Sequence, residues 1–131
     1  MRVAVVLDAS AVTRFAQGRD AAVGELLGEI ADEQSFAAVP VTAIALAHAQ
    51  LPEPEHQGLL DLLVGQNPTV VVMPMLADEG RLIGQYSAEL GQRLGLAHAV
   101  REAERNQAQL VTADGDLVRT AFGEIYGIVD L

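Results

Sequence analysis

The chain has 131 residues, of which 50% are hydrophobic but only 4% aromatic, and its 18 acidic and 8 basic residues give a net charge of −10. This length predicts a single domain over residues 1–131, with a core of aliphatic side chains. The absence of cysteine excludes disulfides, thiolate metal sites and cysteine nucleophiles. The acidity argues against indiscriminate nucleic-acid binding, but it permits a metal-bridged contact or a basic protein partner.

The apolar runs of the sequence are too short to predict a secretory signal peptide or a membrane-spanning helix. Residues 3–7 form a run shorter than the apolar core of a secretory signal peptide. No run approaches the roughly 20 residues that a membrane-spanning helix needs. We therefore expect a cytoplasmic protein that makes no contact with a membrane.

The hydrophobic pattern predicts short buried strands that alternate with helices. Continuous apolar runs indicate strands buried on both faces, and apolar residues at i, i+3, i+4 and i+7 indicate amphipathic helices. Asp20 and Thr42 are the expected N-caps of two helices. In chain order we predict strand 3–7, helix 10–16, a helix after Asp20 that contains residues 23–30, strand 36–39, helix 43–51, helix 55–65, strand 69–73, helix 76–90, helix 94–105, strand 109–112, helix 117–122 and strand 125–129.

This order of elements is typical of βαβ units. Such units form a parallel sheet with helices on both faces. We therefore predict an α/β fold, a three-layer α/β/α sandwich around a mostly parallel five-stranded sheet. A nucleotide-binding variant of this class is disfavoured, because Asp8-Ala9-Ser10 follows the first strand where a Gly-rich phosphate loop would be needed.

Three carboxylates follow two of these strands. Asp8 ends the first apolar run, and Asp114 and Asp116 follow the run at residues 109–112. The carboxyl ends of parallel strands meet at one edge of a sheet, where α/β proteins bind ligands. Carboxylates gathered there suit Mg²⁺ or Mn²⁺ and metal-dependent phosphodiester hydrolysis. The alternative is structural, because an aspartate after a strand also caps a helix or closes a turn.

The segments around these acids resemble the PIN domains, especially the VapC-type toxin ribonucleases of bacterial toxin–antitoxin pairs. Residues 7–11, Leu-Asp-Ala-Ser-Ala, are similar to the opening of that family, and residues 112–117, Thr-Ala-Asp-Gly-Asp-Leu, to its closing motif. The resemblance extends over nearly the whole chain. It implies a Mg²⁺- or Mn²⁺-dependent endoribonuclease whose catalytic and metal-binding acids include Asp8, Asp114 and Asp116.

Two further acids that the resemblance implies are replaced in this chain. His48 stands where the family has a glutamate on a helix, and Leu96 where it has a later aspartate. Leu96 cannot bind a cation and continues an apolar stripe, so we expect it in the core. His48 is open to three interpretations: a metal ligand that favours ions softer than Mg²⁺, an imidazolium paired with Asp8 or Asp116, or a histidine without a ligand role.

Other polar residues near the motifs are assigned supporting or surface roles. Ser10 and Thr112 are expected to hydrogen-bond the carboxylates, or else to cap the turns that follow. The spacing of His98, Arg101, Glu102 and Arg105 predicts a solvated helix face.

The sequence thus leaves two functions open. The first is a VapC-like endoribonuclease with a depleted acidic centre and weak or lost activity, acting on RNA and partnered by an antitoxin. The second is a catalytically inactive PIN-fold module that binds or regulates through protein partners or dimerisation. A homodimer is expected in either case.

Overall fold

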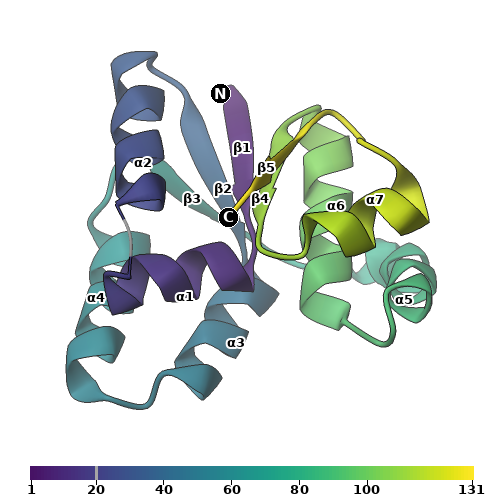
Figure 1. The fold of residues 1–131 in the computed structure, drawn as a ribbon, viewed down its shortest axis with the longest axis horizontal. Helices are drawn as coiled ribbons and strands as arrows, with labels where there is room; N and C mark the ends of the chain where they lie inside the picture. The colour runs from purple at the N-terminus through teal and green to yellow at the C-terminus, as the bar shows by residue number, and fades with distance from the viewer. Residues whose placement is uncertain (20) are drawn as a thin grey trace.

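The sheet is all parallel and lies between two layers of helices. The computed structural model describes residues 1–19 and 21–131, so the predicted cap at Asp20 lies outside the described residues. Figure 1 shows the sheet edge-on between its helices. The strands are β1 (Val3–Leu7), β2 (Phe36–Pro40), β3 (Val70–Met73), β4 (Gln109–Thr112) and β5 (Ile128–Asp130), in the order β3-β2-β1-β4-β5. The predicted α/β class and three-layer architecture are confirmed.

The strands form where the chain has continuous β-branched and aliphatic runs. β1 occupies the centre of the sheet and pairs in parallel with β2 and β4. Val5, Val6 and Leu7 are at most 2% exposed, because helices cover both faces of this strand. The central strands β1 and β4 end side by side, with Leu7 in register with Val111. Asp8 and Ala113, which follow these strands, therefore lie at the same edge of the sheet.

The helices divide between two apolar cores. α1 (Ala9–Gln17), α2 (Ala22–Asp32), α3 (Val41–Gln50) and α4 (Pro54–Gly65) contribute buried side chains to the core on one face of the sheet. α5 (Gly80–Glu89), α6 (Leu94–Asn106) and α7 (Gly115–Phe122) contribute to the core on the other face, and a 3-10 turn at Ala77–Glu79 precedes α5. Within the described residues, no helix is both long and apolar enough to span a membrane.

Two predicted boundaries are wrong for identifiable reasons. α3 begins at Val41, so Thr42 lies inside the helix and does not cap it. Its hydroxyl instead bonds to the ring of His98, 2.8 Å away on α6. The last strand begins at Ile128 rather than at residue 125, because Ile125 and Gly127 both have positive φ angles and form a turn.

The predicted solvated face of α6 is also wrong. His98 is fully buried and Glu102 is 3% exposed, while Arg101 and Arg105 bond to Glu79. α6 is enclosed because it packs against α5 and α3 as well as against strands β1, β2 and β4. The His98 Nε2 atom lies 3.5 Å from Glu102 Oε1, so the two polar groups are buried as a pair.

Truncation of a core leucine tests this packing. Leu110 of β4 is fully buried in the core between the sheet and α6, so Leu110→Ala should lower the free energy of unfolding by about 2–5 kcal/mol. Leu59→Ala, at a position 40% exposed on α4, should cost less than about 1 kcal/mol. Urea denaturation followed by circular dichroism measures both. Equal losses in the two variants would contradict the assignment of Leu110 to the core.

Candidate functional site

The buried Asp8 carboxylate accepts hydrogen bonds from three donors. It is 3% exposed and is the N-cap of α1. Its Oδ1 atom accepts from the Ser10 hydroxyl at 2.5 Å and from the Ala11 N–H at 3.0 Å. Its Oδ2 atom accepts from the Thr112 hydroxyl at 2.6 Å. Both oxygens are therefore engaged by the protein itself.

The two hydroxyls extend this network to the segment after β4. The Ser10 oxygen accepts from the Ala113 N–H at 2.8 Å. The Thr112 oxygen accepts from the Asp114 N–H at 2.9 Å. Ser10 and Thr112 thus join the end of β1 to the turn after β4, and the predicted hydrogen bonds from these residues to a carboxylate are present at Asp8.

Burial raises the pKa of the Asp8 carboxyl above its ordinary value of 3.8. Desolvation is the largest cause, since it disfavours the charged form. The bonds from Ser10, Thr112 and Ala11 act in the opposite direction, and the nearby charge of Asp114 adds to the upward shift. Ionised Asp8 is thus less favourable in the folded protein than in the unfolded chain.

Asp114 is held by an arginine that the sequence reasoning missed. The Arg93 Nη2 atom donates to Asp114 Oδ2 at 2.8 Å. Arg93 directly precedes α6, and a cation at the amino end of a helix opposes the helix dipole. That unfavourable placement, in a chain with only eight basic residues, is the signal that could have identified it. Both side chains are partly exposed, so the pair contributes less than about 1 kcal/mol to stability.

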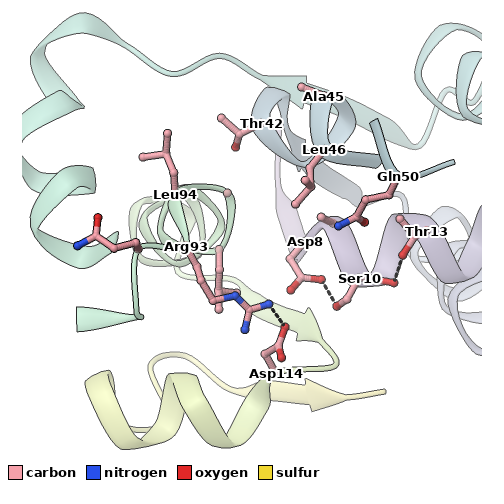
Figure 2. Close-up of a pocket in the computed structure, with 14 residues that line it drawn as sticks. Asp8, Ser10, Thr13, Thr42, Ala45, Leu46, Gln50, Arg93, Leu94 and Asp114 are labelled. Carbon is pink, nitrogen blue, oxygen red and sulfur yellow. Dashed lines mark hydrogen bonds and ion pairs between the residues drawn. The ribbon is translucent and has the colours of Figure 1, made fainter. Parts of the chain in front are cut away.

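A cavity of about 630 Å³ opens between α1, α3, the start of α6 and the turn after β4. Asp8 and Asp114 line it, and the Arg93–Asp114 pair lies at one side of the opening in Figure 2. Leu46, 41% exposed, projects into the space from α3, and Leu96 lines it from α6. The polar lining is completed by Thr13, Thr42, Gln50 and Gln92.

His48 does not lie beside the carboxylates. Its Nδ1 atom is 2.5 Å from Gln57 Oε1, and its Nε2 atom is 3.8 Å from Asp61 Oδ1, so the ring faces α4. Gln57 also donates to the backbone carbonyl of His48, which fixes the end of α3 against α4. The residue of α3 that faces Asp8 across the cavity is Leu46, two positions earlier. The observed contacts are those of a histidine without a ligand role.

Asp116 lies outside the cavity that Asp8 lines, and it borders a separate pocket together with Asp114. Its side chain is fully exposed, does not line the cavity, and lies 3.3 Å from Arg119 on the next turn of α7. Leu96 is 6% exposed, and it belongs to the core as well as lining the cavity. The structure therefore brings Asp8, Asp114 and Leu96 together in one cavity, and His48 and Asp116 do not line it.

The carboxylates of the cavity are occupied by contacts within the chain. Residues 1–19 and 21–131 contain no group of three or more acidic or histidine side chains placed to hold a metal ion. The Asp8 oxygens already accept three bonds, and Asp114 has a cation of its own. Mg²⁺ is usually held by one or two carboxylates together with water and phosphate oxygens, so a cation at this site would have to compete with these contacts. The cavity is lined mostly by apolar surface. The charges of Arg93 and Asp114 at its opening offset each other.

The raised pKa of Asp8 predicts a pH-dependent stability. Between pH 3.8 and the raised pKa the folded protein binds the Asp8 proton more tightly than the unfolded chain. The Asp8 contribution to the free energy of unfolding therefore decreases as the pH rises through this window. Asp8→Asn keeps a capping side chain but cannot titrate, so the difference between wild type and variant should decrease over the same window and level off above it.

Urea denaturation from about pH 4 to pH 8 measures this difference. Asp116→Asn, at a fully exposed position, serves as the control and should change the free energy of unfolding at pH 7 by less than about 0.5 kcal/mol. A wild-type minus Asp8→Asn difference that stays constant, or increases with pH, would contradict the raised pKa.

Comparisons with known proteins add no family assignment. No protein-family model matches the chain, and a search of curated proteins found no similar sequence.

Proposed function

We propose that this protein is a PIN-like domain, resembling the VapC-type toxins, whose acidic centre has lost metal-dependent ribonuclease activity and which acts as a binding module for a protein partner. One observation carries the proposal: both carboxylates of the cavity are engaged by groups of the chain itself. Asp8 accepts hydrogen bonds from three donors, and Asp114 is paired with Arg93.

The walls of the cavity support the same proposal. Leu46 and Leu96 occupy positions from which a side chain reaches toward Asp8 and Asp114, and neither can ligate a cation. The net charge of −10 disfavours an RNA backbone as ligand and suits a basic protein, such as an antitoxin-like partner.

Residual nuclease activity is the second candidate. It is favoured by one observation, that Asp8 and Asp114 still line the same cavity. In that case a cation would have to displace Arg93 from Asp114 and compete with the donors on Asp8. The two functions therefore differ in whether the protein binds Mn²⁺ at all.

Two experiments distinguish the two functions: Mn²⁺ titration of the wild type, and titration of a variant designed to bind Mn²⁺. We expect wild-type protein to show no binding heat with about 1 mM Mn²⁺ and to leave single-stranded RNA intact. The double variant Leu46→Glu, Arg93→Ala adds a carboxylate to the cavity and frees Asp114. It should bind Mn²⁺ at least about tenfold more tightly than the matched control Leu59→Glu, Arg93→Ala. The control is matched because Leu59 is 40% exposed, close to the 41% of Leu46.

Calorimetry measures both variants, with circular dichroism as the check on folding. Millimolar or tighter Mn²⁺ binding by the wild type, together with RNA cleavage that Asp114→Asn abolishes, would overturn the proposal and establish the nuclease.

A genetic test addresses the binding role directly. Asp114→Asn removes a carboxylate that metal-dependent cleavage would require, at a side chain that is partly exposed. Expressed in its host, this variant should retain the biological effect of the wild type, because the proposed role needs the shape of the cavity rather than a bound cation. Loss of the effect at an unchanged protein level, together with loss of Mn²⁺-dependent RNA cleavage by the purified variant, would favour the nuclease instead.

A further inference from the structure

Three hydroxyl side chains line the cavity that contains Asp8 and Asp114, and each has a hydrogen-bond partner inside the protein. Ser10 and Thr13 belong to α1, and Thr42 belongs to α3 (Figure 2). A hydroxyl has one proton to donate and two lone pairs with which to accept. The direction of each internal bond therefore determines whether the hydroxyl acts as a donor or as an acceptor toward a ligand.

Both hydroxyls of α1 donate their protons within the protein. The Ser10 hydroxyl donates to the ionised Asp8 carboxylate at 2.5 Å, and the Thr13 hydroxyl donates to the Ser10 carbonyl at 3.1 Å. A carbonyl and an ionised carboxylate can only accept, so both directions are fixed. One lone pair of the Ser10 hydroxyl also accepts from the Ala113 N–H. Toward a ligand, the two hydroxyls of α1 therefore offer only their remaining lone pairs.

The direction of the Thr42 bond is set by a buried histidine. The Thr42 oxygen lies 2.8 Å from Nδ1 of His98, which is fully buried, and the other ring nitrogen, Nε2, lies 3.5 Å from Glu102 Oε1. A neutral imidazole carries one ring proton. On Nε2 this proton faces the carboxylate, whereas a bare Nε2 would direct its lone pair at a negative oxygen. We assign the proton to Nε2, so Nδ1 accepts the proton of Thr42.

The surroundings of His98 favour the neutral ring over an imidazolium. Among the described residues Nε2 has no hydrogen-bond partner, although Glu102 lies within ion-pair distance. A buried ion pair offsets its desolvation only when its geometry and hydrogen bonds are good. The Thr42 hydroxyl thus donates toward the core, and like the hydroxyls of α1 it presents lone pairs to the cavity.

We propose that the cavity binds a small aliphatic amine, whose ammonium group donates hydrogen bonds to these hydroxyl oxygens. Among the described residues, the lining has two carboxylates, Asp8 and Asp114, and one cation, Arg93. Together with the net charge of −10, this balance attracts a cation. The cavity volume of about 630 Å³ lies within the range of small-molecule sites, about 300–1,000 Å³.

The two ends of an aliphatic amine match the two kinds of surface in the cavity. A primary ammonium has three N–H donors and no lone pair, so it suits a lining of acceptors. Leu46 and Leu94, which are 41% and 50% exposed, offer apolar surface to the alkyl chain. An anion is disfavoured, because its oxygens would face hydroxyl lone pairs, and because the Arg93 guanidinium is already paired with Asp114 at 2.8 Å.

This inference goes beyond the proposed function and can fail separately from it. Amine binding depends on the hydroxyl of Thr42, whereas the test of the proposed function depends on the carboxylates and Mn²⁺. Thr42→Val should therefore weaken amine binding and leave the Mn²⁺ response unaffected.

Titration of the full chain with three six-carbon probes tests the ligand class, followed by amide chemical shifts in NMR at about pH 7.5. Hexylammonium should shift the amides of Thr42 and Leu94 and bind at least about fivefold more tightly than hexanol, because its hydrogen bonds are charge-assisted. Hexanoate, which has the same chain and the opposite charge, should give no saturable shift.

Variants at Thr42 test the acceptor directly. Thr42→Val should weaken hexylammonium binding at least about threefold, because the oxygen is lost while the shape is kept. Thr42→Ser restores the oxygen and should bind like the wild type. Thr120→Val is the matched control: its exposed hydroxyl donates to the Asp116 carbonyl outside the cavity, so its removal should leave binding unchanged. Circular dichroism checks the folding of each variant.

Nitrogen NMR of the imidazole rings provides a readout that needs no ligand. At about pH 7.5 the His98 ring should carry a single proton, on Nε2. A proton on Nδ1, or on both nitrogens, would contradict the assigned direction of the Thr42 bond. Absence of hexylammonium binding, or hexanoate binding of equal strength, would overturn the proposal. So would tighter binding of a lysine blocked at both ends, since the cavity would then select a polypeptide side chain.

Discussion

The hydrogen bonds to the Asp8 carboxylate are the constraint on which the rest of the site depends. They join the end of β1, the first turn of α1 and the end of β4 at one buried group. Ser10 and Thr112 then hold the amides of residues 113 and 114, and so set the turn from which Asp114 reaches the cavity. Because an unpaired buried donor costs about 1–3 kcal/mol, Asp8 stabilises this network by accepting the buried Thr112 hydroxyl.

The cavity has the location of a ligand site, and both of its carboxylates are held by groups of the chain. It lies beyond the carboxyl ends of β1 and β4, where parallel sheets place their ligands. One of its carboxylates is committed to folding, and the other is neutralised by Arg93. One fold can therefore carry sites of different chemistry, because function depends on the side chains placed at the site and not on the fold alone.

The strands and the fold class could be predicted from sequence because continuous apolar runs bury both faces of a strand. The burial of His98 could not, since the charges around it have the spacing of a solvated helix face. Only the packing of α6 against α5, α3 and the sheet encloses that residue. The start of β5 was also missed, because the left-handed turn at Ile125 interrupts a run that is apolar in sequence.

The candidate site was predicted as far as its backbone positions, but its side-chain directions were not. Asp8 and Asp114 follow from strand ends that any parallel sheet brings together. The direction of His48 depends on Gln57 of α4, and that of Asp116 on its position in the first turn of α7. Arg93 approaches Asp114 from 21 residues away, so its role is set by the tertiary structure rather than by a motif.

The position of Asp8 as a structural cap changes how genetic results at this residue should be understood. In many enzymes a strand-end aspartate can be replaced to silence the chemistry while the protein remains at its normal level. Here the same carboxylate holds three parts of the fold together, so its loss shifts the population toward unfolded chains. Cellular proteases remove such chains, and a loss-of-function phenotype at Asp8 would then reflect turnover of the protein and not a missing catalytic group.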